Sequence, residues 1–294
     1  MSIIKVRIGT SDNKSGLLRA TFTQAELKRF GIDSDVKIIP TPRVLEQSTA
    51  VDTERHIVRA MEDYLLQGEI DVAVYAMEHL PVKLPESLAI TAVSQRQDPT
   101  DLLLIRREAY DVHSLFKIKN RGIVGAASVL QQMQLADYRP DVQFYADFSD
   151  TESRLKQLDL GDIDAIFLSA MDYNGLTLAI QGVEIVVLNP REFVPAPARG
   201  VTVWQTNRQD VATRQLFRPL HRNEVSVCTN IERRVLQLME DLEHYPAVYS
   251  ERDGNGNFHT FAACEIGGIV ERAHLSSSTH LGVAQKIVNK LLGN

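Results

Sequence analysis

Recognisable catalytic or metal-binding motifs are few in this 294-residue sequence. The two cysteines, Cys228 and Cys264, lie in different contexts, and neither is surrounded by metal-ligand spacing. The glycine pair Gly267 and Gly268 lacks the spacing of a dinucleotide-binding turn, and this favours a strand bend over a phosphate cradle. The sequence therefore predicts no metal site, and no recognisable nucleophile or phosphate loop stands out.

Two titratable residues, Glu78 and His79, follow a short apolar segment at residues 70–75 that is typical of a strand. A loop histidine titrates near neutral pH, but its use as an acid or base requires a partner, and the sequence identifies none. We therefore interpret His79 as a loop residue without a catalytic role. A new acid–base centre at His79 or Glu78 is the alternative.

The elements that must position these residues alternate between short apolar runs and longer helical patterns, which indicates α/β architecture. The first block has strands at 3–10, 35–40 and 70–75 and helices at 17–30 and 55–67. The second block has strands at 102–105, 122–125, 142–145, 165–168 and 183–188 and helices at 128–138 and 152–158. After residue 223 come a helix at 232–242, a hairpin signal at 253–257 and a helix at 281–292. We predict three domains: residues 1–97 with 195–218, residues 98–194, and residues 219–294.

Composition narrows the class of protein. Hydrophobic residues make up 44% and charged residues 24%, which is typical of a globular chain. The net charge of −6 provides no basic excess for nucleic acid, and no apolar run approaches the roughly 20 residues of a membrane span. The N-terminal segment is charged where a signal peptide needs an apolar region. We expect a cytoplasmic protein that binds neither nucleic acid nor membrane.

Several segments, taken in order, resemble the porphobilinogen deaminase (hydroxymethylbilane synthase) family. They are residues 7–10, 66–74, 80–85, 96–101, 155–158, 162–166, 195–197 and 232–233. The resemblance implies two periplasmic-binding-protein-like α/β lobes, a small α+β C-terminal domain and an ancestry in tetrapyrrole (haem) biosynthesis. The family condenses pyrrole units on a dipyrromethane primer, which a cysteine of the third domain holds through a thioether.

The chain departs from the family at that cysteine. Leu242 and Glu243 stand where the family has its cofactor cysteine, and neither side chain contains sulfur. Cys264 lies about twenty positions away in an apolar run, and we interpret it as a small core residue. We therefore predict that the chain carries no dipyrromethane and no other cofactor.

The chain also departs from the family in its catalytic segment. The resemblance places His79 at the catalytic aspartate, which stabilises the cation formed as ammonia leaves, and Glu78 at a neighbouring lysine. A protonated histidine would repel that cation, and a neutral histidine accepts hydrogen bonds less strongly than a carboxylate.

The family's arginines for the substrate's acetate and propionate groups are largely replaced. Leu130 and Gln131 stand at two of them, Ser11 at a third and residues 148–150 near a fourth, and only Arg154 is retained. A charge-assisted contact contributes roughly 1.5–3 kcal/mol, so losing about four removes on the order of 6–12 kcal/mol of binding free energy. We predict that the known deaminase reaction is lost.

The sequence leaves three alternative functions open. The first is a pseudoenzyme that binds an unknown small molecule or partner protein in the cleft between two lobes. The second is an enzyme with altered chemistry in the same cleft, and the third is an active deaminase with an unconventional cofactor attachment. The candidate cleft residues are Thr10, Ser11, Asn13, Lys14, His79, Ser128, Gln131, Arg154 and Arg199.

Overall fold

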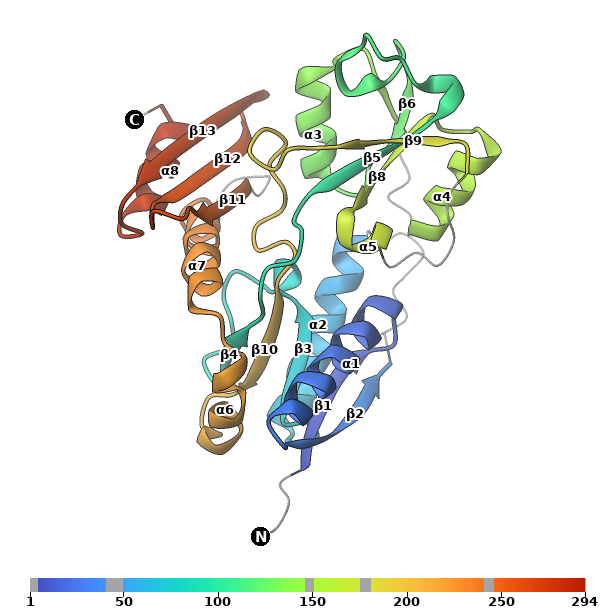
Figure 1. The fold of residues 1–294 in the computed structure, drawn as a ribbon. Helices are drawn as coiled ribbons and strands as arrows, with labels where there is room; N and C mark the ends of the chain where they lie inside the picture. The colour runs from blue at the N-terminus through green and yellow to red at the C-terminus, as the bar shows by residue number, and fades with distance from the viewer. Residues whose placement is uncertain (1–4, 41–49, 146–150, 175–180, 241–245, 294) are drawn as a thin grey trace. The chain divides into compact units, whose positions relative to one another are not determined.

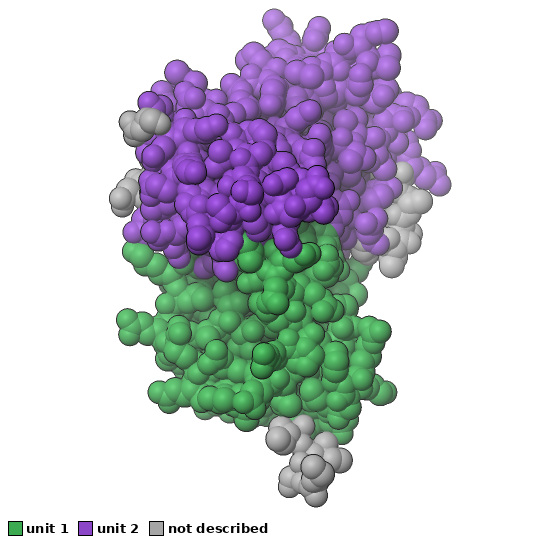
Figure 2. Space-filling view, turned by 60° about the vertical axis from the view of Figure 1, so that its left-hand side comes forward, with its two compact units in different colours: residues 1–97, 199–227 green, residues 98–198, 228–294 purple. Residues whose placement is uncertain are grey.

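A computed structural model describes residues 5–40, 50–145, 151–174, 181–240 and 246–293 (Figure 1). The chain divides into two compact units, which Figure 2 draws in green and purple. Unit 1 comprises residues 1–97 and 199–227, and unit 2 comprises residues 98–198 and 228–294. The boundaries of the three expected domains stay a prediction.

Unit 1 is built on a five-stranded sheet with the order β2-β1-β3-β10-β4 (Figure 1). Its strands are β1 (Lys5–Ser11), β2 (Asp33–Ile39), β3 (Val72–Ala76), β4 (Leu88–Val93) and β10 (Thr202–Asn207). β1 pairs in parallel with β2 and β3, whereas β10 runs antiparallel to both β3 and β4. A strand from residues beyond 200 therefore completes the N-terminal sheet.

The helical elements of unit 1 are α1 (Lys14–Arg29), α2 (Ala50–Leu66), α6 (Val211–Phe217) and the short 3-10 turns η1 (Met77–His79) and η4 (Arg218–Leu220). Helix α1 begins at Asn13, whose side chain accepts a hydrogen bond from the backbone N–H of Gly16 at 2.7 Å. It buries Ala20 and Leu27 against the sheet and stops before Gly31, whose φ is 72°.

Unit 2 contains a second five-stranded sheet, with the order β7-β6-β8-β5-β9. Its strands are β5 (Asp101–Arg106), β6 (Ile123–Gly125), β7 (Gln143–Tyr145), β8 (Ala165–Ser169) and β9 (Val183–Val187). Its helical elements are α3 (Val129–Tyr138), α4 (Thr151–Leu160), α5 (Ala170–Asn174), η2 (Arg107–Ala109) and η3 (Leu115–Lys117). β6 pairs in parallel with β7 and β8, and β5 runs antiparallel to β8 and β9, so this sheet repeats the topology of the first.

A third, three-stranded sheet also belongs to unit 2, with the order β11-β12-β13. Its elements are β11 (Ala247–Arg252), β12 (Phe258–Ile266), β13 (Ile269–Ser277) and α8 (Val283–Leu291), preceded by α7 (Asn223–Leu238). Gly267 and Gly268 join β12 to β13 with φ values of 61° and 82°. Two consecutive positive φ angles are what a two-residue hairpin turn requires, so the glycine pair is a tight turn between strands.

The fold class is confirmed: two α/β lobes share one topology, and a small α+β unit follows them. The sequence did not reveal β4, β10 or β13 as strands. In β10 the reason is burial of polar residues, because Thr202, Gln205 and Thr206 are buried together with Trp204. A run of this kind shows neither the alternation nor the continuous apolar character by which a strand is recognised.

Candidate functional site

The candidate residues of unit 1 gather at one edge of its sheet. β1 and β3 are parallel neighbours, so Thr10 and Ser11 at the end of β1 lie at the same edge as η1, which follows β3. β10 runs in the opposite direction and pairs Thr202 with Ala76, which brings the segment before β10 to this edge too. Carboxyl ends of parallel strands are where α/β folds place their ligands.

Glu78 and Arg199 form an ion pair at this edge. Arg199 Nε donates a hydrogen bond to Glu78 Oε2 at 2.9 Å, and the side chains are only 16% and 12% exposed. Burial is the largest single effect and would raise the pKa of the Glu78 carboxyl. The charges of Arg199, His79 and Arg19, together with the hydrogen bond from Arg199, outweigh burial and hold that pKa below its ordinary value. Glu78 is therefore an ionised carboxylate whose charge Arg199 neutralises, and it is not poised as a proton donor.

The start of α1 adds hydroxyl groups to the same edge. Thr10 is fully buried, and its Oγ1 has no hydrogen-bond partner among the described residues. A Cβ at Gly16 would lie 3.0 Å from Thr10 Oγ1 and 2.2 Å from Ser11 Oγ, so both hydroxyls face the first turn of the helix. Asn13 caps that turn, and Lys14 is exposed beside it. Helix N-termini favour anions, because their first N–H groups have no intrahelical acceptor.

In unit 2, Ser128 and Gln131 come together at the start of α3. Ser128 caps the helix by accepting from the backbone N–H of Gln131 at 3.3 Å. The Gln131 side chain accepts from Ala127 N at 2.8 Å and donates to Asp101 Oδ1 at 3.0 Å, and Gln131 and Asp101 are both buried. The side-chain amide of Gln131 thus stabilises the turn before α3. It does not provide the positive charge that the family's arginine offers to a carboxylate.

Arg154, the retained family arginine, lies on α4 and is 5% exposed. Its Nη2 donates to Thr151 Oγ1 at 3.2 Å, one turn earlier on the same helix. The structure therefore shows Arg154 as a buried residue of unit 2. Leu242 and Glu243 lie outside the described residues.

The sequence missed a buried polar chain that supports η1. Tyr75 donates to Gln205 Oε1, and Gln205 Nε2 donates to Glu62 Oε1 at 2.9 Å. Burial raises the pKa of both Glu62 and Tyr75. These hydrogen bonds hold the end of β3 in place just before Glu78. The three residues come from three elements and lie up to 143 residues apart, so no local spacing in the sequence predicts this hydrogen-bonded group.

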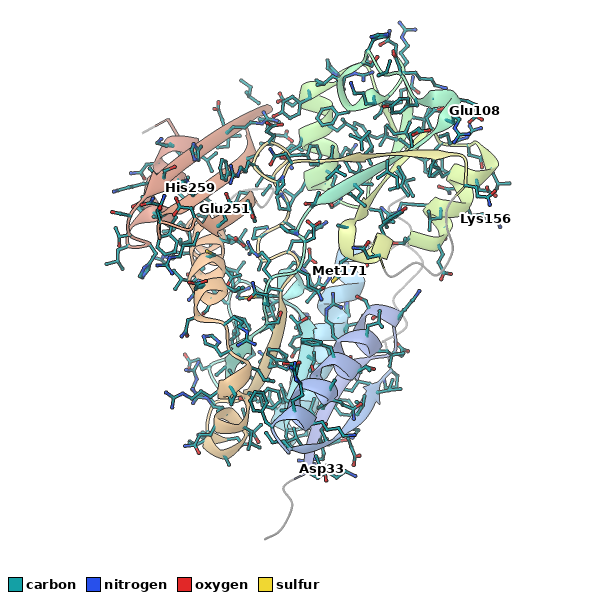
Figure 3. All side chains as sticks on the ribbon, in the orientation of Figure 1. Asp33, Glu108, Lys156, Met171, Glu251 and His259 are labelled. Atoms are coloured by element: carbon teal, nitrogen blue, oxygen red, sulfur yellow. The ribbon has the colours of Figure 1, made fainter. Side chains whose placement is uncertain are left out.

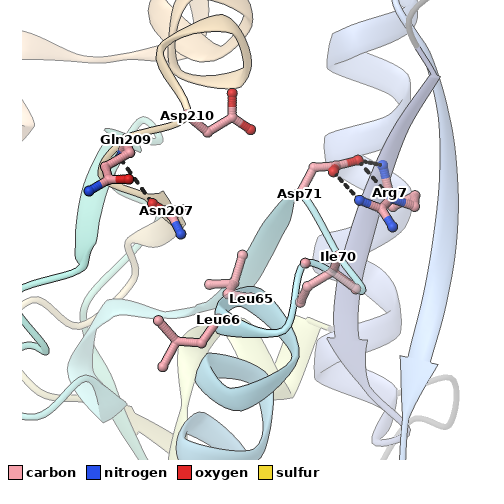
Figure 4. Close-up of a pocket in the computed structure, with 9 residues that line it drawn as sticks. Arg7, Leu65, Leu66, Ile70, Asp71, Asn207, Gln209 and Asp210 are labelled. Atoms are coloured by element: carbon pink, nitrogen blue, oxygen red, sulfur yellow. Dashed lines mark hydrogen bonds and ion pairs between the residues drawn. The ribbon is translucent and has the colours of Figure 1, made fainter.

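A separate pocket of about 330 Å³ opens at the opposite end of the unit 1 sheet (Figure 4). Its charged wall is Arg7 with Asp71, joined by Arg7 Nε to Asp71 Oδ2 at 3.1 Å and Arg7 Nη2 to Asp71 Oδ1 at 2.5 Å. The other lining residues are Leu65, Leu66, Gly68, Ile70, Asn207, Gln209 and Asp210. The charges of Arg7 and Asp71 neutralise each other, Asp210 adds one further negative charge, and this lining has no histidine, cysteine, serine or threonine.

Both cysteines are buried, which for Cys264 matches the interpretation of a small core residue. Burial raises the pKa of the Cys264 thiol to about 11. The thiolate is the nucleophilic form, so a thiol with this pKa reacts slowly at neutral pH. Nothing in this environment favours Cys264 as a substitute attachment point.

Two α/β lobes of one topology and a small third sheet define the fold class, and the candidate residues of unit 1 lie at the carboxyl ends of its parallel strands. A family model described as "Porphobilinogen deaminase, dipyromethane cofactor binding domain" matches residues 6–215. The chain belongs to the porphobilinogen deaminase family, as its sequence resemblance implied.

Two porphobilinogen deaminases agree with this assignment. A porphobilinogen deaminase of Chloroherpeton thalassium is 29% identical over 86% of this chain and 80% of its own length. Another, of Shouchella clausii, is 31% identical over 80% of this chain and 76% of its own. Among solved structures, a periplasmic sulfonate-binding protein of Methylobacillus flagellatus has a TM-score of 0.46 at 12% identity, covering 81% of this chain and 70% of its own.

The prediction that the chain has no cofactor is wrong, because the matching family model is that of the dipyrromethane cofactor binding domain. The error came from treating one missing cysteine as the whole cofactor site. The matched region, 6–215, ends before residue 242 and includes the edge formed by α1 and η1. The hydroxyls of Thr10 and Ser11, the start of α1 and the exposed Lys14 fit the carboxylates of such a group. When bound, a dipyrromethane supplies the primer for pyrrole condensation.

The described helices include none that is both long and apolar enough to cross a membrane. The described residues also include no group of three or more histidine, cysteine, aspartate and glutamate side chains that could hold a metal ion.

Proposed function

We propose that this chain binds a carboxylated pyrrole compound of tetrapyrrole biosynthesis in unit 1 and has lost hydroxymethylbilane synthase activity. The observation that supports the loss is the Glu78–Arg199 ion pair, which lies in the segment resembling the family's catalytic loop. A deaminase has to stabilise a developing cation there, and an unpaired carboxylate does this best. Here the carboxylate of Glu78 is neutralised by Arg199, and the neighbouring residue is His79.

Binding is supported by the buried hydroxyl of Thr10 and the helix end that it faces. A buried hydroxyl without a partner costs free energy, and a ligand carboxylate that accepts its proton recovers that cost. Lys14, the first residue of α1, adds a positive charge at the same helix N-terminus. A small molecule is therefore favoured over a partner protein as the ligand of this edge.

A porphobilinogen consumption assay on the full chain tests the loss of activity. We expect no turnover from the wild-type chain. Recovery of turnover in the double variant E78K/H79D would identify the catalytic segment as the site of the loss. Turnover by the wild-type chain would contradict the proposal and favour an active deaminase with an unconventional cofactor attachment.

Calorimetric titration with porphobilinogen tests binding separately. Because a hydrogen bond to a charged group contributes roughly 1.5–3 kcal/mol, T10V should weaken binding by about 10- to 100-fold. The matched control is T21V, which removes an exposed hydroxyl of α1 that donates to Leu17 O. Equal affinities of T10V and T21V would show that porphobilinogen does not bind at this edge, whatever the activity assay shows.

A further inference from the structure

Four polar side chains form a continuous hydrogen-bonded chain on the third sheet. His259 Nε2 lies 3.2 Å from Asp253 Oδ2, and His259 Nδ1 lies 2.8 Å from Ser276 Oγ. Ser276 Oγ is in turn 3.2 Å from His274 Nε2. The register pairs His259 with Ser276 and Phe261 with His274, so the histidines and the serine share one face of the β12–β13 ladder. Figure 3 labels His259 on this sheet.

The hydrogen-bond roles along this chain follow from the carboxylate at its end. An ionised Asp253 only accepts, so His259 Nε2 carries the proton and donates to it. In the neutral form of His259 that a metal ion needs as its ligand, Nδ1 has a lone pair and accepts from the Ser276 hydroxyl. The serine oxygen accepts from His274 Nε2. Two imidazole nitrogens therefore converge on one small hydroxyl group.

Both imidazole rings are held in position by neighbours. Asp253 is fixed by the backbone N–H groups of Asn255 and Asn257, at 2.9 and 2.8 Å. The His274 ring stacks on Phe261, with ring centroids 4.4 Å apart and an interplanar angle of 7°. Ser276 is exposed, so solvent reaches the point at which the two nitrogens converge.

We infer that His259 and His274 are a two-histidine site for a borderline transition-metal ion such as Zn²⁺, Ni²⁺ or Cu²⁺. Neutral imidazole is the preferred nitrogen ligand of these ions, with metal–nitrogen distances of about 2.0–2.1 Å for zinc. Binding needs the Ser276 side chain to move aside or to become a ligand, and His274 to shift its proton from Nε2 to Nδ1. Water completes the coordination.

Asp253 strengthens the inference because it is a second-shell partner of the kind found at metal sites. A ligating histidine almost always donates its other ring N–H to a carboxylate, a backbone carbonyl or water, which fixes the tautomer and the ring. Opposing this, Lys290 Nζ donates to the backbone oxygen of His274 at 2.9 Å and brings a positive charge nearby. With two protein nitrogens as ligands, the site is weaker than a four-ligand structural zinc site.

Calorimetric titration of the chelator-treated full chain with ZnCl₂ tests the site. We expect one equivalent to bind, and H259A and H274A should each lower its affinity by more than about tenfold. The matched control H280A removes a histidine that packs edge-on against Phe258, outside the hydrogen-bonded chain, and should leave the affinity unchanged. Wild-type affinity in the double variant H259A/H274A would overturn the inference.

The positioning role of Asp253 has its own readout. D253N keeps an oxygen that can accept from the turn N–H groups but removes the charge behind His259. We expect the same stoichiometry with an affinity about 10- to 100-fold lower. If the alanine variants fail to fold, electron paramagnetic resonance of the wild-type chain with one equivalent of Cu²⁺ decides. Coupling to two imidazole nitrogens supports the site, and coupling to one or none overturns it.

Discussion

Arg199 donates from Nε to Glu78 Oε2 at 2.9 Å, although 121 residues separate the two in the sequence. Glu78 lies in η1 after β3, and Arg199 lies just before β10, the strand that pairs with β3. The antiparallel pairing of these strands thus places the ion pair at the proposed ligand edge. A carboxylate that Arg199 already neutralises stabilises a cationic intermediate less than an unpaired carboxylate does.

Removing only the cation of this pair should destabilise unit 1. R199M leaves the Glu78 charge largely buried without its partner, and we expect the free energy of unfolding to fall by about 3 kcal/mol. The double variant E78L/R199M removes both charges and should recover most of that loss. Urea denaturation of the wild type, both single variants and the double variant measures the coupling. Additive effects of the two substitutions would show that the pair contributes nothing.

The Arg139–Asp141 pair predicts a dependence of stability on pH. Hydrogen bonds from Arg139, with Nε to Oδ1 at 2.6 Å, and from the Arg121 backbone hold the pKa of Asp141 well below its ordinary value. A depressed folded-state pKa stabilises the fold fully above the unfolded pKa of about 4, and this contribution is lost as pH falls through the folded pKa. The stability difference between wild type and D141N should therefore shrink from pH 7 to pH 3. Denaturation curves at both pH values measure it, and a constant difference would contradict it.

Glu232 connects three segments of unit 2 through two backbone donors. Ala198 N donates to its Oε2 at 2.6 Å and Ser250 N donates to its Oε1 at 2.7 Å, and Glu232 is fully buried. E232A leaves both N–H groups buried without this acceptor, which should cost roughly 2–5 kcal/mol. E232Q keeps one amide oxygen and should cost less. The exposed Glu271 supplies the control, because E271A should change stability by less than about 0.5 kcal/mol. Equal effects of E232A and E271A would be the contrary result.

Both thiols should be unreactive in the folded protein. Cys228 and Cys264 are buried, and the pKa of Cys264 is raised to about 11. A thiol reagent such as dithionitrobenzoate at pH 8 should label neither in the native state within minutes. Both should react after denaturation in urea. Fast native labelling that C264S abolishes would show that Cys264 is an accessible nucleophile.

Local sequence patterns determined much of the architecture. The helix of α1 was predictable from apolar spacing and the stop at Gly31, and β3 from a continuous apolar run before the Glu78 loop. Such elements depend on residues that are close in the sequence, so they can be predicted from local periodicity. The order of family-like segments also specified the family, including its cofactor domain, better than the cofactor cysteine alone did.

Tertiary structure decided which residues meet. β10 is recognisable only once it lies between β3 and β4, because its buried polar side chains hide it from any local pattern. The pairing of Glu78 with Arg199 depends on that strand, and the convergence of His259 and His274 depends on the register of β12 with β13. The physical reason is that the sequence encodes periodicity locally, whereas partners distant in the chain are chosen by sheet pairing and packing of the whole fold.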